Sequence, residues 1–217
     1  MKKTIALLLA AAGFAMADTY TASTPAKSGT GAQGNYYGFT IAFDNSTYLT
    51  TDVPADTVLN LDSITLQSRT GDATFADMKV AVYTFVGDGT VGTFLGTSST
   101  VTFAADTTFT LTFDGIQVNS SDSYQFLYVA AGTDDSTLSS FEGYQAAAMS
   151  WGTSVTNSFG ASIPAGWGTY KASGLNSWEG QYIPVTTVTL STPVVPEPAT
   201  ATLSLLALAG LAARRRR

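Results

Sequence analysis

The chain has 217 residues and contains neither cysteine nor histidine. These absences exclude a Ser–His–Asp triad, a cysteine nucleophile, a zinc site built on His or Cys, and any disulfide. Residues 18–195 hold 15 of the chain's 16 acidic residues and only four basic ones, a net charge of −11. This charge disfavours nucleic acid as a partner, because phosphate binding needs clustered Lys and Arg.

The amino-terminal segment has the pattern of a secretory signal peptide. Two lysines precede an apolar stretch at residues 5–12, and Ala15 and Ala17 place small side chains at the two positions that a signal peptidase reads. Cleavage is expected before Asp18. Residues 1–17 are therefore predicted to be a signal peptide, and the protein is predicted to be exported with signal peptidase as a processing partner.

Alternation of apolar and polar residues predicts β-strands through the central part of the chain. In residues 37–43 the large apolar side chains all fall on odd positions, and in residues 107–113 apolar residues alternate with threonines. Residues 78–86 and 124–130 are apolar on both faces, which predicts central strands covered on both sides. Residues 181–190 are predicted to form the last strand.

Turn signals separate these strands, and no helical period is sustained between them. Residues 44–46, 87–89 and 114–115 are turn-forming, and the apolar positions change parity around Asp62 and Ser63, which predicts a β-bulge. Threonine is abundant, whereas lysine and glutamate are scarce, which favours pleated backbone. We therefore expect one all-β domain over residues 18–193, an antiparallel β-sandwich of jelly-roll-like type.

Residues 149–180 hold all three tryptophans, Trp151, Trp167 and Trp178, in a tract rich in Gly, Ser and Asn. Such a long tract in a compact domain suggests function or disorder. Exposed indole faces could stack on sugar rings, which makes these tryptophans candidate carbohydrate-binding residues with an extracellular polysaccharide or glycan as partner. The alternative is that they close one end of the sandwich and are buried, as large aromatic residues more often are.

Two carboxylates form the only candidate catalytic pair. Glu142 and Glu179 each lie between an aromatic residue and a glycine, and a glycosidase needs two carboxylates flanking the scissile bond. Nothing in the sequence brings the two together, and the E-x-D-x-E strand signature of the sandwich glucanases is absent. Solvated surface carboxylates are the ordinary explanation, so we assign no catalytic residue and do not expect an enzyme.

Calcium is the remaining cofactor to weigh, because it prefers oxygen ligands. Asp134 and Asp135, or the turn at Asp88, could supply two of the six to eight oxygens that calcium takes. No D-x-D-x-D-G loop is present, and aspartates of this kind commonly form turns and aid solubility. We therefore assign no metal site and no cofactor.

The carboxyl-terminal segment has three parts in a fixed order. The tripeptide Pro196, Glu197 and Pro198 precedes an apolar stretch that ends at residue 213, and the cluster Arg214, Arg215, Arg216 and Arg217 follows. A helix over residues 199–213 would be about 22 Å long, shorter than the ~30 Å hydrocarbon core, so spanning the membrane would need local thinning and snorkelling by the arginines. The basic cluster would stay cytoplasmic.

This arrangement closely resembles the PEP-CTERM sorting signal of Gram-negative bacteria. The resemblance covers residues 194–217, with Pro196, Glu197 and Pro198 as the sorting motif and the four arginines as the basic cluster. It implies recognition by an exosortase, a membrane cysteine protease-transpeptidase, and transient tethering in the inner membrane. Without processing, the same segment would be a simple C-terminal anchor. The resemblance leaves the activity of residues 18–193 open.

These patterns together predict an exported, exosortase-processed protein of the cell surface or extracellular matrix. We expect its role to be structural or adhesive and non-catalytic. The alternatives are a carbohydrate-binding module that uses the tryptophan-rich loops and, after it, a carboxylate glycosidase.

Overall fold

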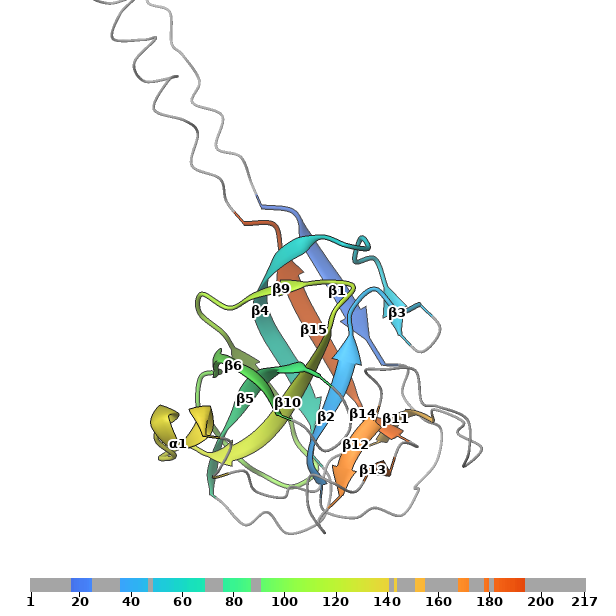
Figure 1. The fold of residues 1–217 in the computed structure, drawn as a ribbon. Helices are drawn as coiled ribbons and strands as arrows, with labels where there is room; N and C mark the ends of the chain where they lie inside the picture. The colour runs from blue at the N-terminus through green and yellow to red at the C-terminus, as the bar shows by residue number, and fades with distance from the viewer. Residues whose placement is uncertain are drawn as a thin grey trace, which may run out of the picture. The chain divides into compact units, whose positions relative to one another are not determined.

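Figure 1 shows the fold in a computed structural model of the chain. The structure describes residues 17–24, 36–46, 49–68, 76–86, 91–140, 143, 151–154, 168–171, 178–179 and 182–193. The chain divides into two compact units, Thr19–Thr192 and a unit made of Met1–Asp18 with Pro193–Arg217. Almost all of the second unit lies outside the described residues, and every described strand belongs to Thr19–Thr192.

Strands make up nearly all of the described secondary structure. They are β1 (Thr19–Ser23), β2 (Tyr36–Ala42), β3 (Thr50–Thr51), β4 (Val58–Gln67), β5 (Asp77–Phe85), β6 (Val91–Thr97), β7 (Val101–Thr102), β8 (Thr108–Thr112), β9 (Gln117–Asn119), β10 (Ser123–Ala130), β11 (Trp151–Ser154), β12 (Gly168–Lys171), β13 (Trp178–Glu179), β14 (Tyr182–Pro184) and β15 (Thr186–Ser191). The helix α1 spans Asp135–Ser139. The prediction of an all-β fold is confirmed.

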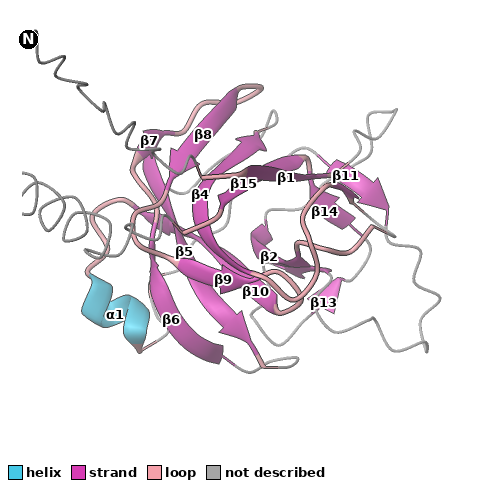
Figure 2. Cartoon of the chain, turned by 90° about the horizontal axis from the view of Figure 1, so that it is seen from above, coloured by secondary structure: helices cyan, strands magenta, loops and turns pink. Residues whose placement is uncertain are grey.

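The strands form two main antiparallel sheets, which Figure 2 shows facing one another. Sheet A has the order β3-β1-β15-β4-β8, with β9 also on β4, and sheet B has the order β13-β12-β2-β10-β5-β6, with β7 also on β5. A separate pair joins β11 to β14. The two sheets contain the strand orders β1-β15-β4-β8 and β2-β10-β5-β6. When these eight strands are counted from one to eight along the chain, the orders are 1-8-3-6 and 2-7-4-5, which are those of an eight-stranded jelly roll.

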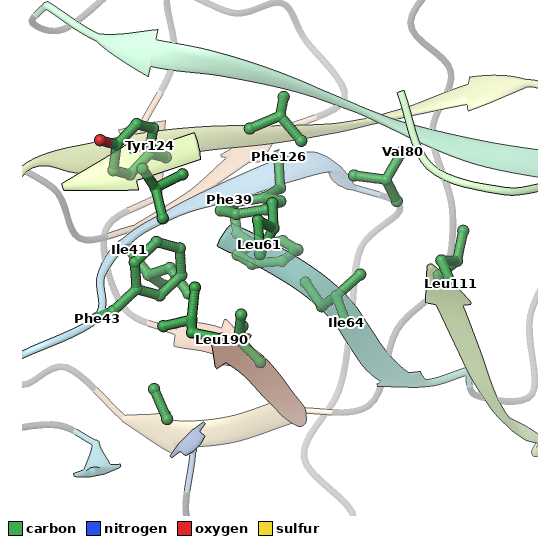
Figure 3. Packing of buried hydrophobic residues seen from close by; sticks show 14 of the residues in the cluster. Phe39, Ile41, Phe43, Leu61, Ile64, Val80, Leu111, Tyr124, Phe126 and Leu190 are labelled. Atoms are coloured by element: carbon green, nitrogen blue, oxygen red, sulfur yellow. The ribbon is translucent and has the colours of Figure 1, made fainter. Parts of the chain in front are cut away.

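The core lies between the two sheets and is built from the inward-facing residues of both. Phe39 and Phe126 stack with ring centroids 5.2 Å apart, and Phe43 meets the edge of the Phe126 ring at 6.2 Å. Figure 3 shows these rings of sheet B against Leu61 and Leu190 of sheet A. The predicted inward face of the strand over residues 37–43 is confirmed for Phe39, Ile41 and Phe43, which are fully buried, whereas Tyr37 packs against the cluster on the outer face of sheet B.

The predicted bulge in β4 is confirmed by the register of its neighbour β15. Thr189 lies opposite Ser63, but the next residue, Leu190, lies opposite Leu61, so Asp62 is the extra residue. The Asp62 carbonyl oxygen accepts a hydrogen bond from Phe113 N at 2.8 Å. The extra residue restores the inward direction of the leucines before the bulge, which explains the change of parity.

The single strand predicted over residues 181–190 divides into two. β14 ends at Pro184 and pairs with β11, whereas β15 begins at Thr186 and pairs with β1 and β4. Thr24, which is buried, bridges the break: its Oγ1 lies 3.0 Å from the Pro184 carbonyl oxygen and accepts from Thr186 N at 2.8 Å. Because proline has no N–H for a ladder, Pro184 also suits a strand end.

A second, smaller hydrophobic cluster covers the outer face of sheet B. Ala81, Tyr83, Leu127 and Val129 point away from the main core and pack against Leu138 of α1. Both β5 and β10 are therefore buried on their two faces, as the apolar runs over residues 78–86 and 124–130 predicted.

Close packing of β2 on β10 requires a glycine at one position. A Cβ atom built on Gly38 would overlap the backbone carbonyl oxygen of Phe126 in the neighbouring strand. The glycine therefore allows the two strands to approach each other there.

Candidate functional site

The first and last strands of the sandwich, β1 and β15, are neighbours. The chain enters β1 and leaves β15 at the same end of the fold. Thr19, at the start of β1, lies opposite Ser191, at the end of β15. Figure 1 shows these strand ends together, with β11, β12, β13 and β14 at the opposite end. The predicted signal peptide, sorting motif and basic cluster lie outside the described residues, apart from residue 17. Among the described residues, no helix has the length and apolarity needed to cross a membrane.

Two of the three tryptophans lie in strands at the opposite end, in different sheets. Trp151 begins β11 and lies opposite Pro184 of β14. Trp178 begins β13, the edge strand of sheet B, and lies opposite Tyr170 of β12. Trp167 falls outside the described residues, as do the side chains of the other two tryptophans. Carbohydrate stacking and burial of the indoles both stay predictions.

Of the two carboxylates weighed as a candidate catalytic pair, only the backbone of Glu179 lies within the described residues. Glu179 is in β13, opposite Thr169 of β12. Glu142 falls outside the described residues, so the glycosidase alternative stays untested.

The two aspartates weighed as calcium ligands have structural roles around α1. Asp134 is the N-cap: its Oδ1 accepts from Ser136 Oγ and from Ser136 N, which lies 2.7 Å away. These hydrogen bonds, the side-chain one first, lower the pKa of Asp134 below its ordinary value. Asp135 pairs with Lys79, with Nζ and Oδ1 3.3 Å apart. Asp88 lies outside the described residues.

Lys79 holds the segment before α1 on the outer face of sheet B. Its Nζ also donates to the Thr133 carbonyl oxygen at 2.8 Å, and its side chain is only 11% exposed. The Lys79 ammonium group is therefore bound by other groups of the same chain. Within the described part of the chain, no three His, Cys, Asp or Glu residues gather as a metal site would require.

Three buried tyrosines carry raised pKa values, and each has a structural position. Burial, helped by the charge of Asp135, raises the pKa of Tyr83 to about 12, and its hydroxyl donates to the Leu138 carbonyl oxygen at 2.8 Å. Burial also raises the pKa of Tyr124, whose hydroxyl accepts from Asn119 N at 2.6 Å, and the pKa of Tyr128. All three phenols stay protonated at neutral pH, which makes them poor nucleophiles.

The outer face of sheet A presents an ordered array of small hydroxyl side chains, which we call the hydroxyl face. Its residues share the outward side of neighbouring strands and none of them is buried. They are Thr50 of β3; Thr19, Thr21 and Ser23 of β1; Thr187, Thr189 and Ser191 of β15; Ser63 and Thr65 of β4; and Thr110 and Thr112 of β8.

The register between neighbouring strands places these hydroxyl side chains in rows across the sheet. One row passes from Ser23 to Thr187, Thr65 and Thr110 on four consecutive strands, each directly opposite the next. In the sequence, the threonines of residues 107–113 mark only the polar side of a strand. The alternating Thr187 and Thr189 carry the same signal, but the pairing of these distant strands is what joins them into one face.

Comparison with known proteins bears on the carboxyl-terminal segment. Residues 194–217 match the family model described as the PEP-CTERM protein-sorting motif. Neither the curated proteins nor the solved structures contain a match to the chain. The matched range contains the Pro-Glu-Pro tripeptide and the four arginines, as predicted from the sequence. The chain therefore carries a PEP-CTERM sorting motif, which marks it as an exported substrate of an exosortase that is processed from a membrane-anchored precursor.

Proposed function

We propose that this protein is a non-catalytic structural or adhesive component of the cell surface or extracellular matrix of a Gram-negative bacterium. The observation that carries the proposal is the sorting motif at residues 194–217 on a compact all-β unit. The motif accounts for export and for processing by exosortase. The role outside the cell is the part that we add.

The position of the chain ends supports display of the folded unit. β15, which precedes the sorting segment, is a neighbour of β1, which follows the predicted signal peptide. A tether through the carboxyl terminus therefore starts at the end of the fold that holds Thr19 and Ser191. The end formed by β11–β14 lies away from those strand ends (Figure 1).

The chemistry of the chain supports a non-catalytic role. Histidine and cysteine, the commonest general base and the strongest nucleophile, do not occur in the sequence. Asp134 caps a helix, Asp135 pairs with Lys79, and the hydroxyl of Tyr83 bonds to a carbonyl oxygen. These groups are already used to hold α1 on the sheet.

A carbohydrate-binding module is the second candidate, and one observation favours it. Tyr170 and Trp178 are register partners in the two strands at the edge of sheet B, at the end away from Thr19 and Ser191. Replacing Trp151 or Trp178 by Ala should abolish glycan binding with little change in melting temperature if the indoles form a platform. If the indoles are core residues, the same change should cost about 3–5 kcal/mol of unfolding free energy.

Intact-mass measurement of the native product tests the processing that the proposal requires. We expect the mature protein to begin at or near Asp18 and to end upstream of Ala201, because the two prolines keep the motif extended and accessible to a membrane protease. A Glu197→Ala variant is the matched control and should retain the basic cluster. Recovery of all four arginines from surface-displayed protein would show a permanent anchor instead.

Surface labelling and a glycan screen test the role itself. The mature protein should be labelled on intact cells, and the purified protein should turn over none of the glycans in the screen. Release of product from any glycan would favour the carboxylate glycosidase and overturn the non-catalytic role.

A further inference from the structure

Strand β15 is the part of the sandwich to which the sorting segment is joined. The strand ends at Ser191, and residues 192–195 separate it from Pro196, the first residue of the Pro-Glu-Pro motif. The motif lies within the matched range of residues 194–217. Because this connection is short and covalent, a force on a carboxyl-terminal tether acts first on β15.

β15 is an inner strand of sheet A and not an edge strand. Figure 1 shows it between β1 and β4, and it pairs with both of them in antiparallel register. Five residue pairs join it to β1 and six join it to β4. Its side chains Val188 and Leu190 are fully buried in the main core. Withdrawal of β15 would therefore break two ladders and expose core side chains.

Further hydrogen bonds hold β15 at both of its ends. At its start, Thr24 N donates to the Thr186 carbonyl oxygen at 3.0 Å, and Thr186 N donates to Thr24 Oγ1 at 2.8 Å. At its end, Ser191 Oγ donates to Asp62 Oδ1 at 2.9 Å. Asp62 is the extra residue of the β4 bulge, which fits one register only. β15 therefore cannot slide along β4 and keep its pairing.

The direction of a pull decides how these ladders break. The end of β15 and the end of β4, at Gln67, lie at opposite ends of their shared ladder. A pull between these two points shears the strands and loads the hydrogen bonds together, because the bonds of an antiparallel ladder are perpendicular to the strands. By contrast, Thr19 lies opposite Ser191, so a pull between the start of β1 and the end of β15 opens one pair after another.

We propose that β15 is a force-bearing strand, which resists tension that enters through the carboxyl-terminal tether and is balanced at the opposite end of the sandwich. A protein that is fixed at one end and attached to a matrix or surface at the other is loaded in this direction. Forced unfolding is governed by the unfolding rate, so the strand order can supply this resistance without exceptional equilibrium stability. The inference rests on the proposed surface role and gives that role a mechanical element.

Single-molecule force spectroscopy on the full chain tests the inference. The chain has no cysteine, so a pair of introduced cysteines defines the two points of attachment. Gln67→Cys with Pro193→Cys gives the shearing direction, and Asp18→Cys with Pro193→Cys gives the pairwise opening. At the same pulling speed we expect unfolding in the shearing direction to need at least about twofold more force, because the ladder bonds must break together.

Two controls separate the pulling direction from stability. Chemical denaturation of the two double-cysteine variants should give the same midpoint, since none of the three substituted side chains is buried. Thr24→Val removes a bond at the start of β15 and should lower the shearing force, but the opening force, which is set at the other end of the strand, should not change. Thr192→Cys is the second choice of attachment point if Pro193→Cys prevents folding.

Equal forces in the two directions would overturn the inference, and so would a higher force for the opening direction. The proposed function has an independent readout, because surface labelling on intact cells would support the surface role even if the two forces were equal. Conversely, a higher shearing force would stand as a property of sheet A even if the protein were retained in the membrane.

Discussion

The outer faces of the two sheets differ in polarity. The outer face of sheet B is apolar and is covered by α1, whereas the outer face of sheet A is polar. On sheet B the outward residues of β5 and β10 are apolar, among them Tyr83 and Leu127, and α1 covers them with Leu138. On sheet A the outward residues of β8 and β15 are threonines and one serine, and no described helix packs on them. The comparison shows that the side chains at alternate positions decide whether a sheet face needs a cover, since buried apolar area contributes about 25 cal/mol per Å².

Polar contacts complete the cover on sheet B. A five-residue helix is too short to be stable alone, so tertiary contacts must hold α1 in place. Lys79 and Tyr83 of β5 both donate to backbone carbonyl oxygens of the covering segment, at Thr133 and Leu138. Apolar packing of Leu138 and the two hydrogen bonds donated by Lys79 and Tyr83 of β5 therefore hold α1 on the outer face of sheet B.

Replacing Leu138 by Ala should have the largest effect among these tests. The side chain is fully buried, and its loss leaves a cavity over Ala81 and Tyr83. We expect a loss of about 2–5 kcal/mol of unfolding free energy, measured by chemical denaturation. The matched control is Val58→Ala on sheet A, where the side chain is 53% exposed and the change should stay within about 0.5 kcal/mol. Equal effects of the two variants would show that α1 does not stabilise the fold.

The raised pKa of Tyr83 predicts a loss of stability at alkaline pH. Below pH 10 the phenol is protonated in both the folded and the unfolded chain, so its full contribution is present. Between its ordinary value of 10.0 and the folded value of about 12, the unfolded chain loses the proton first, and stability falls as pH rises. We expect a melting temperature that is flat up to about pH 9 and declines above pH 10.

Tyr83→Phe separates this effect from general alkaline unfolding. The variant loses the hydrogen bond to the Leu138 carbonyl oxygen, which should cost about 0.5–1.5 kcal/mol at neutral pH. It should also show a shallower decline above pH 10. Tyr124 and Tyr128, whose pKa values are raised as well, should preserve part of the slope. An unchanged slope in the variant would contradict the assignment to Tyr83.

Local patterns in the sequence were sufficient to predict several of the strands and the sorting motif, although β1 and β6 were not predicted. Strand β8 alternates Phe109 and Leu111 with threonines, and the parity change at Asp62 marks the bulge, because a period of two makes each inward residue visible. The Pro-Glu-Pro tripeptide, the apolar stretch and the arginines are contiguous in the chain. Neither inference depends on which strands pair.

Features that depend on long-range pairing or on very short elements were not predictable. Helix α1 has one buried leucine and too few residues to show a helical period, so its role as a cover could not be inferred. The pairing of β15 with β4 places Thr187 beside Thr65, far apart in the chain, and only that register creates the hydroxyl face. For the same reason the sequence could not place Trp151 and Trp178 in different sheets.

Removing hydroxyls from the face of sheet A should have the smallest effect on stability. The Thr65 and Thr110 hydroxyls are bonded to each other but exposed, so water can replace the lost bond, and valine suits a strand at least as well as threonine. We expect T65V/T110V to change the unfolding free energy by no more than about 0.5 kcal/mol, a shift of about 1–2 °C in melting temperature.

The same substitution at Thr24 is the contrast that makes this small effect informative. Thr24 is buried, and its Oγ1 accepts from Thr186 N and lies 3.0 Å from the Pro184 carbonyl oxygen. Valine there leaves a buried N–H without its partner, which should cost about 1–3 kcal/mol. A large loss in T65V/T110V would show that the hydroxyl rows are needed for folding. A small loss, beside a large one in Thr24→Val, would show that the fold depends on the buried hydroxyl and not on the exposed rows.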